Sequence, residues 1–523
     1  MRKFVPAFLL LFFVFNQLTA QNVGIGTNTP QSSAILDVSS TDKGFLPPRM
    51  TTAQRNAIAN KVAGLLIYNT NSNCVEMYNG AGWISLCTSL PSSVLPKSLL
   101  GGNNDDRSNF VIQTLDSGYV FAGSTESSED GDVTGTNNAG IDCWVVKMSK
   151  TGVIEWNKVM GGTFNEQVNQ IRQTADGGYV FCASTESSAS GDVTGDNHGP
   201  IGTLDYWVVK LDAAGNVSWD VILGGNLTEV ATSIVQTADG GYVVGGHSSS
   251  SANGDVTPVN HSTNTDCWIV KLTAAGVIQW NVLLGGTGEE ELQAIRQTTD
   301  GGYIATGSTT LAPSGNVSGT INGTFDFWVI KLTSIGGITW NKVLGGSDEE
   351  FSYDVQQTAD GGYIVAGNSN SAASGNISVS THGDFDYLIM KLDASGNTVW
   401  NKMLGGTSVE NVSAIKQTAD GGYIVAGTTA SSASGNITDT GYGLEDAWIV
   451  KLDASGNIVW NRLFGGTNAD FATSIQQTFD GGYIFTGYTM SSASGTISGI
   501  NHDPSGNSND FWVTKLDANG VIQ

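Results

Sequence analysis

The sequence QTADGGYIVAG, residues 417–427, decides the fold, because close variants of it occur seven times along the 523-residue chain. The seven copies begin at Gln113, Gln173, Gln236, Gln297, Gln357, Gln417 and Gln477. Consecutive copies are therefore 60 to 63 residues apart. A fixed period of this length is typical of repeat architectures, in which each unit packs against its neighbours.

Each repeat predicts four short antiparallel strands, and the sixth repeat shows the pattern most simply. A short strand at 412–418 leads through the Asp-Gly-Gly turn at 420–422 into a second strand at 423–427. A long polar loop follows, and two further strands cover 446–453 and 458–466. Four strands in every 60 residues are typical of a β-propeller blade.

The tryptophans and the two ends of the repeat region extend this prediction. Twelve of the 13 tryptophans recur at two fixed positions in the repeat, in the third and fourth strands, where we expect them to form the core between blades. The seventh repeat lacks its fourth strand, but KSLLGG at 97–102 matches the end of that strand in other repeats. We therefore predict an all-β protein: a seven-bladed β-propeller that an N-terminal strand closes without an unpaired edge.

The segments before the propeller differ in composition. Residues 1–20 contain Arg2 and Lys3, a short apolar core and small residues at the end, which predicts a secretory signal peptide. No other stretch is apolar enough to span a membrane. We assign residues 21–90 to a small, mostly β or irregular head module, 91–96 to a linker and 97–523 to the propeller. The expected location is extracellular, on the cell surface or in the periplasm.

Residues 22–86 carry the motifs NVGIGT, ILDVSS, KGFLPPRMT, GLLIYNT and GW in this order. The segment resembles the head module of secreted surface proteins of the Bacteroidetes. This resemblance implies export and a surface or extracellular location, and it implies no reaction. In the repeats, LDASGNIVWN resembles pyrroloquinoline-quinone-type propeller repeats, one residue shorter and without their threonine. That resemblance implies the fold alone.

Charge and cysteine content exclude some functions. The chain has 23 Lys and Arg against 48 Asp and Glu, a formal net charge of −25, so no basic surface is available for nucleic acid. Cys74 and Cys87 flank a short hairpin-like stretch and form the predicted disulfide. Cys143, Cys182 and Cys267 are predicted to be buried thiols.

An acidic residue follows the Gly-Gly pair of every repeat by four positions. The seven acids are Asp106, Glu166, Glu229, Glu290, Glu350, Glu410 and Asp470. They precede the innermost strands, so we expect them to surround the mouth of the central channel. One interpretation is a ligand site in which converging carboxylates bind a cation or a basic group. The other is structural: each acid accepts backbone hydrogen bonds and joins adjacent blades.

The long loops offer a candidate metal site. Asp132, Asp192 and Asp255 lie in sequences that resemble Asp-rich calcium turns, so calcium is the candidate metal and no other cofactor is indicated. The later repeats have Asn or Thr at this position, which argues against a common metal role. An Asp and a Lys also frame every third strand, at 142 and 147 in the first repeat. We expect these to be hydrogen-bonding and solvated positions at strand ends.

The loops between second and third strands contain 18 to 22 residues and share one face, with most of the variation between repeats. Long loops on a rigid scaffold are typical of binding surfaces. The five histidines are expected in these loops, and no motif supplies a nucleophile and its base. We therefore expect a monomeric, non-enzymatic binding or adhesion propeller that presents this face to a glycan or protein ligand. The alternatives are an extracellular enzyme acting on polysaccharide and a structural envelope protein without a specific ligand.

Overall fold

The computed structural model describes residues 23–25, 36–38, 46–71, 74–78, 82–85 and 98–523. The chain divides into two compact units, residues 1–92 and residues 93–523. The predicted signal peptide lies outside the described residues. In the described ranges, no helix is long and apolar enough to cross a membrane.

The described residues of the first unit form two small sheets and one short helix. Its elements are β1 (Val23–Ile25), β2 (Leu36–Val38), β3 (Arg49–Met50), α1 (Thr52–Asn56), β4 (Leu65–Asn69), β5 (Cys74–Tyr78) and β6 (Trp83–Ser85). Strands β1 and β2 pair in parallel, and β3 to β6 form a four-stranded sheet. Helix α1 begins at a capping box formed by Thr51 and Gln54. Cys74 is disulfide-bonded, and its predicted partner Cys87 lies outside the described residues.

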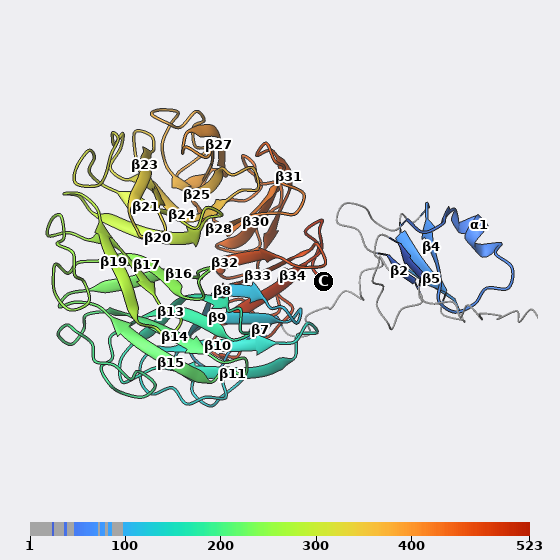
Figure 1. The fold of residues 1–523 in the computed structure, drawn as a ribbon, viewed down its shortest axis with the longest axis horizontal. Helices are drawn as coiled ribbons and strands as arrows, with labels where there is room; N and C mark the ends of the chain where they lie inside the picture. Colours follow the sequence, from blue (N-terminus) through green and yellow to red (C-terminus); the bar gives the residue numbers. More distant parts are fainter. Residues whose placement is uncertain (1–22, 26–35, 39–45, 72–73, 79–81, 86–97) are drawn as a thin grey trace, which may run out of the picture. The chain divides into compact units, whose positions relative to one another are not determined.

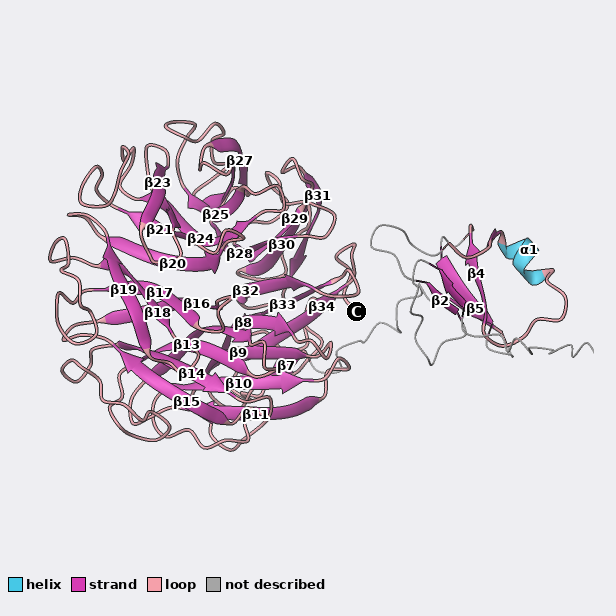
Figure 2. Ribbon diagram, viewed as in Figure 1, coloured by secondary structure: helices cyan, strands magenta, loops and turns pink. Residues whose placement is uncertain are grey.

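The second unit is a ring of seven four-stranded antiparallel sheets whose first strands lie innermost (Figures 1 and 2). Blades 1 to 3 comprise β8 (Asp106–Gln113), β9 (Tyr119–Thr125), β10 (Asp142–Met148), β11 (Ile154–Met160), β12 (Glu166–Gln173), β13 (Tyr179–Thr185), β14 (Asp205–Leu211), β15 (Val217–Leu223), β16 (Glu229–Gln236), β17 (Tyr242–Ser248), β18 (Asp266–Leu272) and β19 (Ile278–Leu284). Blades 4 and 5 comprise β20 (Glu290–Gln297), β21 (Tyr303–Thr309), β22 (Asp326–Leu332), β23 (Ile338–Leu344), β24 (Glu350–Gln357), β25 (Tyr363–Ser369), β26 (Asp386–Leu392) and β27 (Thr398–Leu404). Blades 6 and 7 comprise β28 (Glu410–Gln417), β29 (Tyr423–Thr429), β30 (Asp446–Leu452), β31 (Ile458–Phe464), β32 (Asp470–Gln477), β33 (Tyr483–Thr489), β34 (Asp510–Leu516) and β7 (Leu99–Leu100).

The predicted blade order and ring closure are confirmed. The first strands of successive blades lie next to one another around the whole ring, and β32 contacts β8 across the junction of blades 7 and 1. Strand β7 completes blade 7 by antiparallel pairing with β34, where Leu100 lies opposite Phe511 and Leu99 opposite Trp512. The last sheet therefore combines the two ends of the propeller sequence and leaves no blade incomplete.

The QTxDGGY stretch supplies both a turn and a link between blades. In blade 6 the Asp420 carboxylate accepts hydrogen bonds from the Thr418 hydroxyl and the Gly422 N–H, and Gly421 adopts the positive φ of +83° that the tight turn requires. The side-chain oxygen of Gln417 accepts the N–H of Ala359 in the preceding blade at 2.8 Å. The same link, 2.7 to 2.9 Å long, recurs at every junction: Leu115 to Gln173, Ala175 to Gln236, Ala238 to Gln297, Thr299 to Gln357, Ala359 to Gln417, Ala419 to Gln477 and Phe479 to Gln113.

The core lies between blades, as the tryptophan pattern predicts. The tryptophans of the third strands are almost fully buried: Trp144, Trp207, Trp268, Trp328, Trp448 and Trp512. Those of the fourth strands are half-buried and pack edge-on against a tyrosine of the next blade, as Trp156 does against Tyr179. In the six pairs of this kind, the centroids of the Trp and Tyr rings lie 5.6 to 6.1 Å apart. Each blade therefore buries its apolar faces only when its neighbours are present.

The lysine of each third strand is buried, which corrects the expectation of a solvated position. Lys451 is 4% exposed; its ammonium group donates to the Leu452 carbonyl at 2.9 Å and pairs with Asp420 at 2.9 Å. Equivalent ion pairs join the corresponding Lys and turn Asp in the other six blades. The lysine therefore fixes the Asp-Gly-Gly turn to the third strand of its own blade.

Candidate functional site

The seven acids after the Gly-Gly pairs are buried between blades, and their expected position at the channel mouth is wrong. Each is 0% exposed. Glu410, for example, accepts the Gly406 N–H at 2.6 Å and the Thr429 hydroxyl at 2.6 Å. The acid accepts the same glycine N–H in all seven blades, at 2.5 to 2.8 Å. Because side chains alternate along a strand, the acid points into the blade junction and the residue after it faces the channel.

Each acid lies beside the Asp that begins the third strand of the preceding blade. A Cβ atom added to Gly161 would lie 2.2 Å from Asp142 Oδ1 and 2.6 Å from Glu166 Oε2, so the two carboxyl groups face the same glycine. Asp142 Oδ1 receives no hydrogen bond from an N–H or hydroxyl group in the described part of the chain. Burial, with the Glu166 charge as a smaller cause, raises the pKa of Asp142 to about 7. The pair can therefore share a proton near neutral pH.

The loop acids proposed for calcium bond to the Gly-Gly pair. Asp192 accepts the Gly161 N–H at 3.2 Å, and its own N–H donates to the Gly161 carbonyl. In later blades Asn316, Asn376, Asn436 and Thr496 accept the equivalent N–H, so a neutral oxygen performs the same task. This role explains the exchange of Asp for Asn and Thr. Within the ranges that the structure describes, no group of three or more His, Cys, Asp or Glu residues could hold a metal ion.

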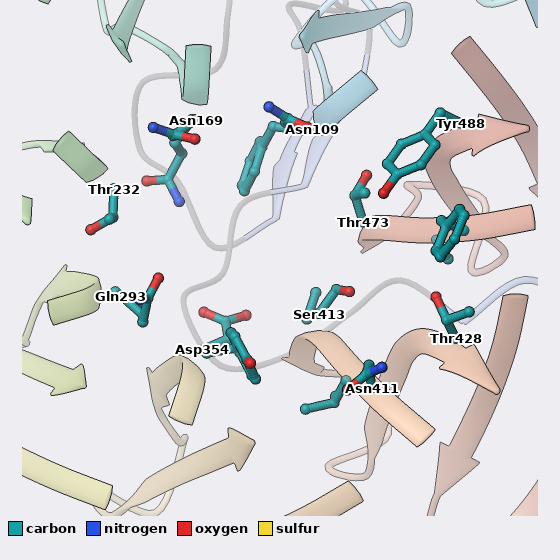
Figure 3. Close-up of a pocket in the computed structure, with 18 of the residues that line it drawn as sticks. Asn109, Asn169, Thr232, Gln293, Asp354, Asn411, Ser413, Thr428, Thr473 and Tyr488 are labelled. Carbon is teal, nitrogen blue, oxygen red and sulfur yellow. The ribbon is translucent and has the colours of Figure 1, made fainter. Parts of the chain in front are cut away.

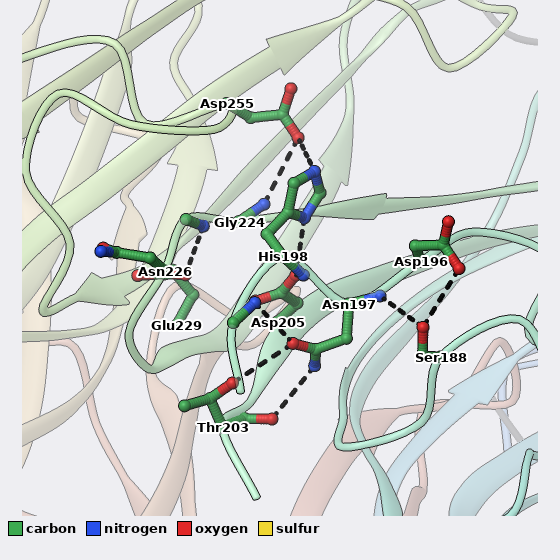
Figure 4. Close-up of polar contacts among 12 residues, drawn as sticks. Ser188, Asp196, Asn197, His198, Thr203, Asp205, Gly224, Asn226, Glu229 and Asp255 are labelled. Carbon is green, nitrogen blue, oxygen red and sulfur yellow. Dashed lines mark hydrogen bonds and ion pairs between the residues drawn. The ribbon is translucent and has the colours of Figure 1, made fainter. Parts of the chain in front are cut away.

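Four histidines join a long loop to the Asp of the third strand, and Figure 4 shows one of them. His198 Nδ1 lies 2.7 Å from Asp205 Oδ2, and its Nε2 lies 3.5 Å from Asp255 Oδ2. His261, His382 and His502 pair with their Asp in the same way. The fifth, His247, lies in strand β17 rather than in a loop, and burial lowers its pKa to about 4. These contacts position loops and bring no nucleophile to a histidine.

The side chains that do face the channel were missed by the sequence analysis. The residue three positions after the acid lies on the channel face and is the extra residue of a β-bulge in each first strand. These residues are Asn109, Asn169, Thr232, Gln293, Tyr353, Ser413 and Thr473. They line a cavity of about 390 Å³. Figure 3 labels all of them except Tyr353. Aligned repeats share the acid but differ at this position, and that contrast is the signal by which the site could be found.

The cavity is chemically uneven around its circumference. On one side Phe471 stacks with Tyr488 at a centroid distance of 4.8 Å, and the guanidinium group of Arg107 lies 5.3 Å from the Tyr488 ring. Figure 3 shows Asn169 and Thr232 across the opening from Tyr488. An aromatic wall therefore faces a wall of hydrogen-bonding groups, which seven identical blades could not produce.

The only carboxylate among the residues that line this cavity, Asp354, is held by two cations. Arg296 lies 2.9 Å from its Oδ1, and the Lys416 ammonium group pairs with its Oδ2. Although burial acts in the opposite direction, the charges of Lys416 and Arg296 hold the pKa of Asp354 below its usual range. Asp354 is therefore ionised, and both of its carboxylate oxygens form ion pairs, so neither oxygen is available for acid–base chemistry.

Comparisons with known proteins add one finding on the head segment. Residues 24–102 match a family model described as a phage tail like trimerisation region. No curated protein matches the chain. Among solved structures, the Pan2 WD40 domain of Neurospora crassa is 8% identical, with 79% of this chain and 97% of that chain covered and a TM-score of 0.41.

Two further structures give similar values. BamB from Moraxella catarrhalis is 14% identical, with 82% of this chain and 92% of that chain covered and a TM-score of 0.33. Hydrazine synthase of Kuenenia stuttgartiensis is 10% identical, with 76% and 95% covered and a TM-score of 0.43. The strand pairing of the chain itself defines a seven-bladed β-propeller protein.

Proposed function

We propose that this protein is a secreted or cell-surface binding propeller, and that its ligand is a glycan that enters the central channel from the long-loop face. The observation that carries the proposal is the uneven cavity in the channel. Phe471 and Tyr488 offer aromatic faces to a sugar ring, and Asn169 and Gln293 offer amide groups to its hydroxyls. A concave site of about 390 Å³ with apolar and polar walls is typical of small-ligand recognition.

Binding without turnover is favoured over hydrolysis of a polysaccharide. Glycoside hydrolysis usually requires two carboxyl groups on either side of the scissile bond. Asp354 is the single carboxylate that lines the cavity, and Arg296 and Lys416 already engage it. The predicted signal peptide and the resemblance of the head to secreted surface proteins support an extracellular role.

A glycan array tests the proposal with the chain from residue 21 onward, in the presence and absence of calcium. We expect specific glycan binding that is lost in Tyr488→Ala and retained in Phe479→Ala. Phe479 is a matched control because its ring is 65% exposed and lies on the Asp-Gly-Gly turn, at the opposite end of the channel. Loss of glycan binding on calcium removal would show that the binding requires calcium.

Other results would favour the alternatives. Release of sugar from a polysaccharide would support the enzyme. Absence of both binding and turnover would support a structural envelope protein. Binding that survives Tyr488→Ala but disappears when a long loop is shortened would move the ligand site from the channel to the loop tips.

The match of residues 24–102 to a trimerisation region supports a trimer in place of the monomer that the sequence analysis predicts. Three propellers joined through their heads would bind a multivalent glycan with higher avidity than one propeller. Light scattering measures this directly: a mass three times that of one chain supports the trimer, and a single-chain mass excludes it.

A further inference from the structure

A second cavity lies in the channel near the Asp-Gly-Gly turns, at the ends of the first strands. Its volume is about 300 Å³, and its polar lining includes Arg172, Gln356, Lys416 and Gln476. All four residues are at or next to the end of their strand, far from the long-loop ends where the first strands begin. This lining differs from that of the first cavity because it includes the two cations Arg172 and Lys416 and no carboxylate, whereas Asp354 lines the first cavity.

The two glutamines are fixed with their amide nitrogens available. Gln356 Oε1 accepts the Gln417 N–H at 2.9 Å, and Gln476 Oε1 accepts the Gln113 N–H at 2.9 Å. A backbone N–H requires an oxygen acceptor, so the opposite orientation of either amide is excluded. Within the described residues, neither amide nitrogen has an acceptor. Both glutamines therefore present an NH₂ group and no free oxygen.

Arg172 adds a cation that no carboxylate neutralises. Its guanidinium group lies 4.8 Å from the Phe110 ring, and it forms no ion pair or side-chain hydrogen bond in the part of the chain that the structure describes. Burial, reinforced by the charge of Arg296, lowers the pKa of Arg172 to about 9, so it remains charged at neutral pH. A half-buried guanidinium with five N–H donors and no protein acceptor favours a ligand that supplies the acceptor.

Lys416 brings a further positive charge to the same place. Its ammonium group pairs with Asp354, which also serves Arg296. Lys416 and Arg296 thus share one carboxylate, and with Arg172 the three cations leave a local net charge of about +2 in a chain whose formal net charge is −25. Local positive potential enclosed by an acidic molecule favours an anion inside the channel.

We propose that this donor pocket, formed by Arg172, Lys416, Gln356 and Gln476, binds an oxyanion, a carboxylate or phosphate group carried by a small molecule. The planar guanidinium group can form two parallel hydrogen bonds to such a group, and the ammonium and amide groups complete the set of donors. The inference goes beyond the proposed glycan site, since it concerns other residues, the other end of the channel and a charged ligand.

Calorimetric titration of the chain from residue 21 onward tests the pocket with four probes: glucuronate, acetate, inorganic phosphate and glucose. We expect glucuronate, acetate or phosphate to bind at least tenfold more tightly than glucose. Arg172→Gln should weaken that binding at least tenfold, and Arg462→Gln, an exposed arginine of β31, should leave it unchanged. Preference for glucuronate and acetate identifies a carboxylate site, and preference for phosphate identifies a phosphate site.

Thermal unfolding gives a second readout that a purely structural role would not produce. Without ligand, Arg172→Gln should melt at a higher temperature than the wild type, because it removes a half-buried charge that forms no ion pair. The bound oxyanion should raise the melting temperature of the wild type and not that of the variant. If Arg172→Gln fails to fold, Arg172→Lys replaces it, because lysine keeps the charge. Arg172→Lys should bind the oxyanion more weakly than the wild type, because it loses the bidentate hydrogen bonds of the guanidinium group.

Two results would overturn the inference: no oxyanion binds more tightly than glucose, or the wild type and Arg172→Gln bind the oxyanion equally. The glycan proposal is judged separately through Tyr488→Ala, which should keep oxyanion binding. Failure of one proposal therefore leaves the other testable.

Discussion

The backbone N–H of Phe479 donates to the side-chain oxygen of Gln113 at 2.7 Å, a hydrogen bond across 366 residues of sequence. It joins blade 7 to blade 1 at the Asp-Gly-Gly end of the ring. At the same junction, β7 pairs with β34 within blade 7. The ring is thus closed both by strand pairing inside the last blade and by the repeated glutamine link between blades.

Gln113→Leu should lower the free energy of unfolding by about 1 kcal/mol, the usual contribution of one hydrogen bond. The effect should stay modest because the Phe479 backbone lies at an exposed position and water can replace the lost acceptor. Urea unfolding measures the change. Gln279→Leu is the matched control, because Gln279 is exposed on an outer strand. An equal loss in both variants would show that the link between blades contributes nothing.

The repeat period was sufficient to predict the blades, their order and the closing strand. The period of about 60 residues, the Asp-Gly-Gly turns and the KSLLGG segment each specify local backbone structure, and stacking follows from them. The repeat pattern therefore predicts a structural role for Gln417, but it does not identify the hydrogen-bond partner of its side chain. Its bond to Ala359 joins two blades, and only the ring geometry brings those atoms together.

The direction of side chains could not be predicted so well. Glu410 was expected at the channel mouth because it precedes the innermost strand, but a displacement of one residue along a strand exchanges the two faces. Ser413, three residues after Glu410, lies on the channel face and is the extra residue of the β-bulge between Val412 and Ala414. A bulge leaves little trace in a single repeat. The donor pocket at Arg172 and Lys416 also depends on contacts between blades that are distant in the sequence.

Leu100→Ala should lower the free energy of unfolding by about 2–4 kcal/mol, since it removes a fully buried side chain from the short strand that completes blade 7. Chemical denaturation of the chain from residue 21 onward measures the loss. Leu115→Ala serves as control, because Leu115 is 76% exposed. A change below about 0.5 kcal/mol for Leu100→Ala would mean that the propeller does not depend on this closure.

Lys451→Met should destabilise the protein by about 1–2 kcal/mol, because the buried Leu452 carbonyl loses its donor. Although partial burial acts in the opposite direction, hydrogen bonds from Thr418 and Lys451 lower the pKa of Asp420 to about 2. This contribution to stability is present above the ordinary pKa of 3.8 and is lost as the pH falls toward 2. In the variant, NMR titration should show a higher pKa for Asp420.

The control for this prediction is Lys150→Met, which replaces an exposed lysine beyond the third strand of blade 1. An unchanged pKa of Asp420 in Lys451→Met would contradict the contact between the two side chains. Unchanged stability would show that water can serve the Leu452 carbonyl.

Asp142→Asn should make the propeller more stable at pH 8 and leave its stability nearly unchanged at pH 5. Burial raises the pKa of Asp142 to about 7, whereas an unfolded aspartate titrates near 3.8. Between these values the folded state holds a proton that the unfolded state has released, so stability falls as the pH rises from about 4 toward 7. The neutral amide removes this dependence at one junction, and it can donate a hydrogen bond to Glu166.

Urea unfolding at pH 5, 6, 7 and 8 measures both chains, with the exposed Asp384→Asn as control. For the wild type we expect greater stability at pH 5 than at pH 8, because Asp106, Asp326 and Asp446 have pKa values raised to about 7, 6 and 6 in the same type of junction. Between pH 5 and pH 8, Asp142→Asn should gain about 2–3 kcal/mol relative to the wild type, since the stability of the wild type falls by about 1.4 kcal/mol per pH unit up to the folded pKa near 7. If the free energies of unfolding of Asp142→Asn and the wild type differ by the same amount at pH 5 and at pH 8, Asp142 is ionised throughout. The buried carboxyl pairs then share no proton.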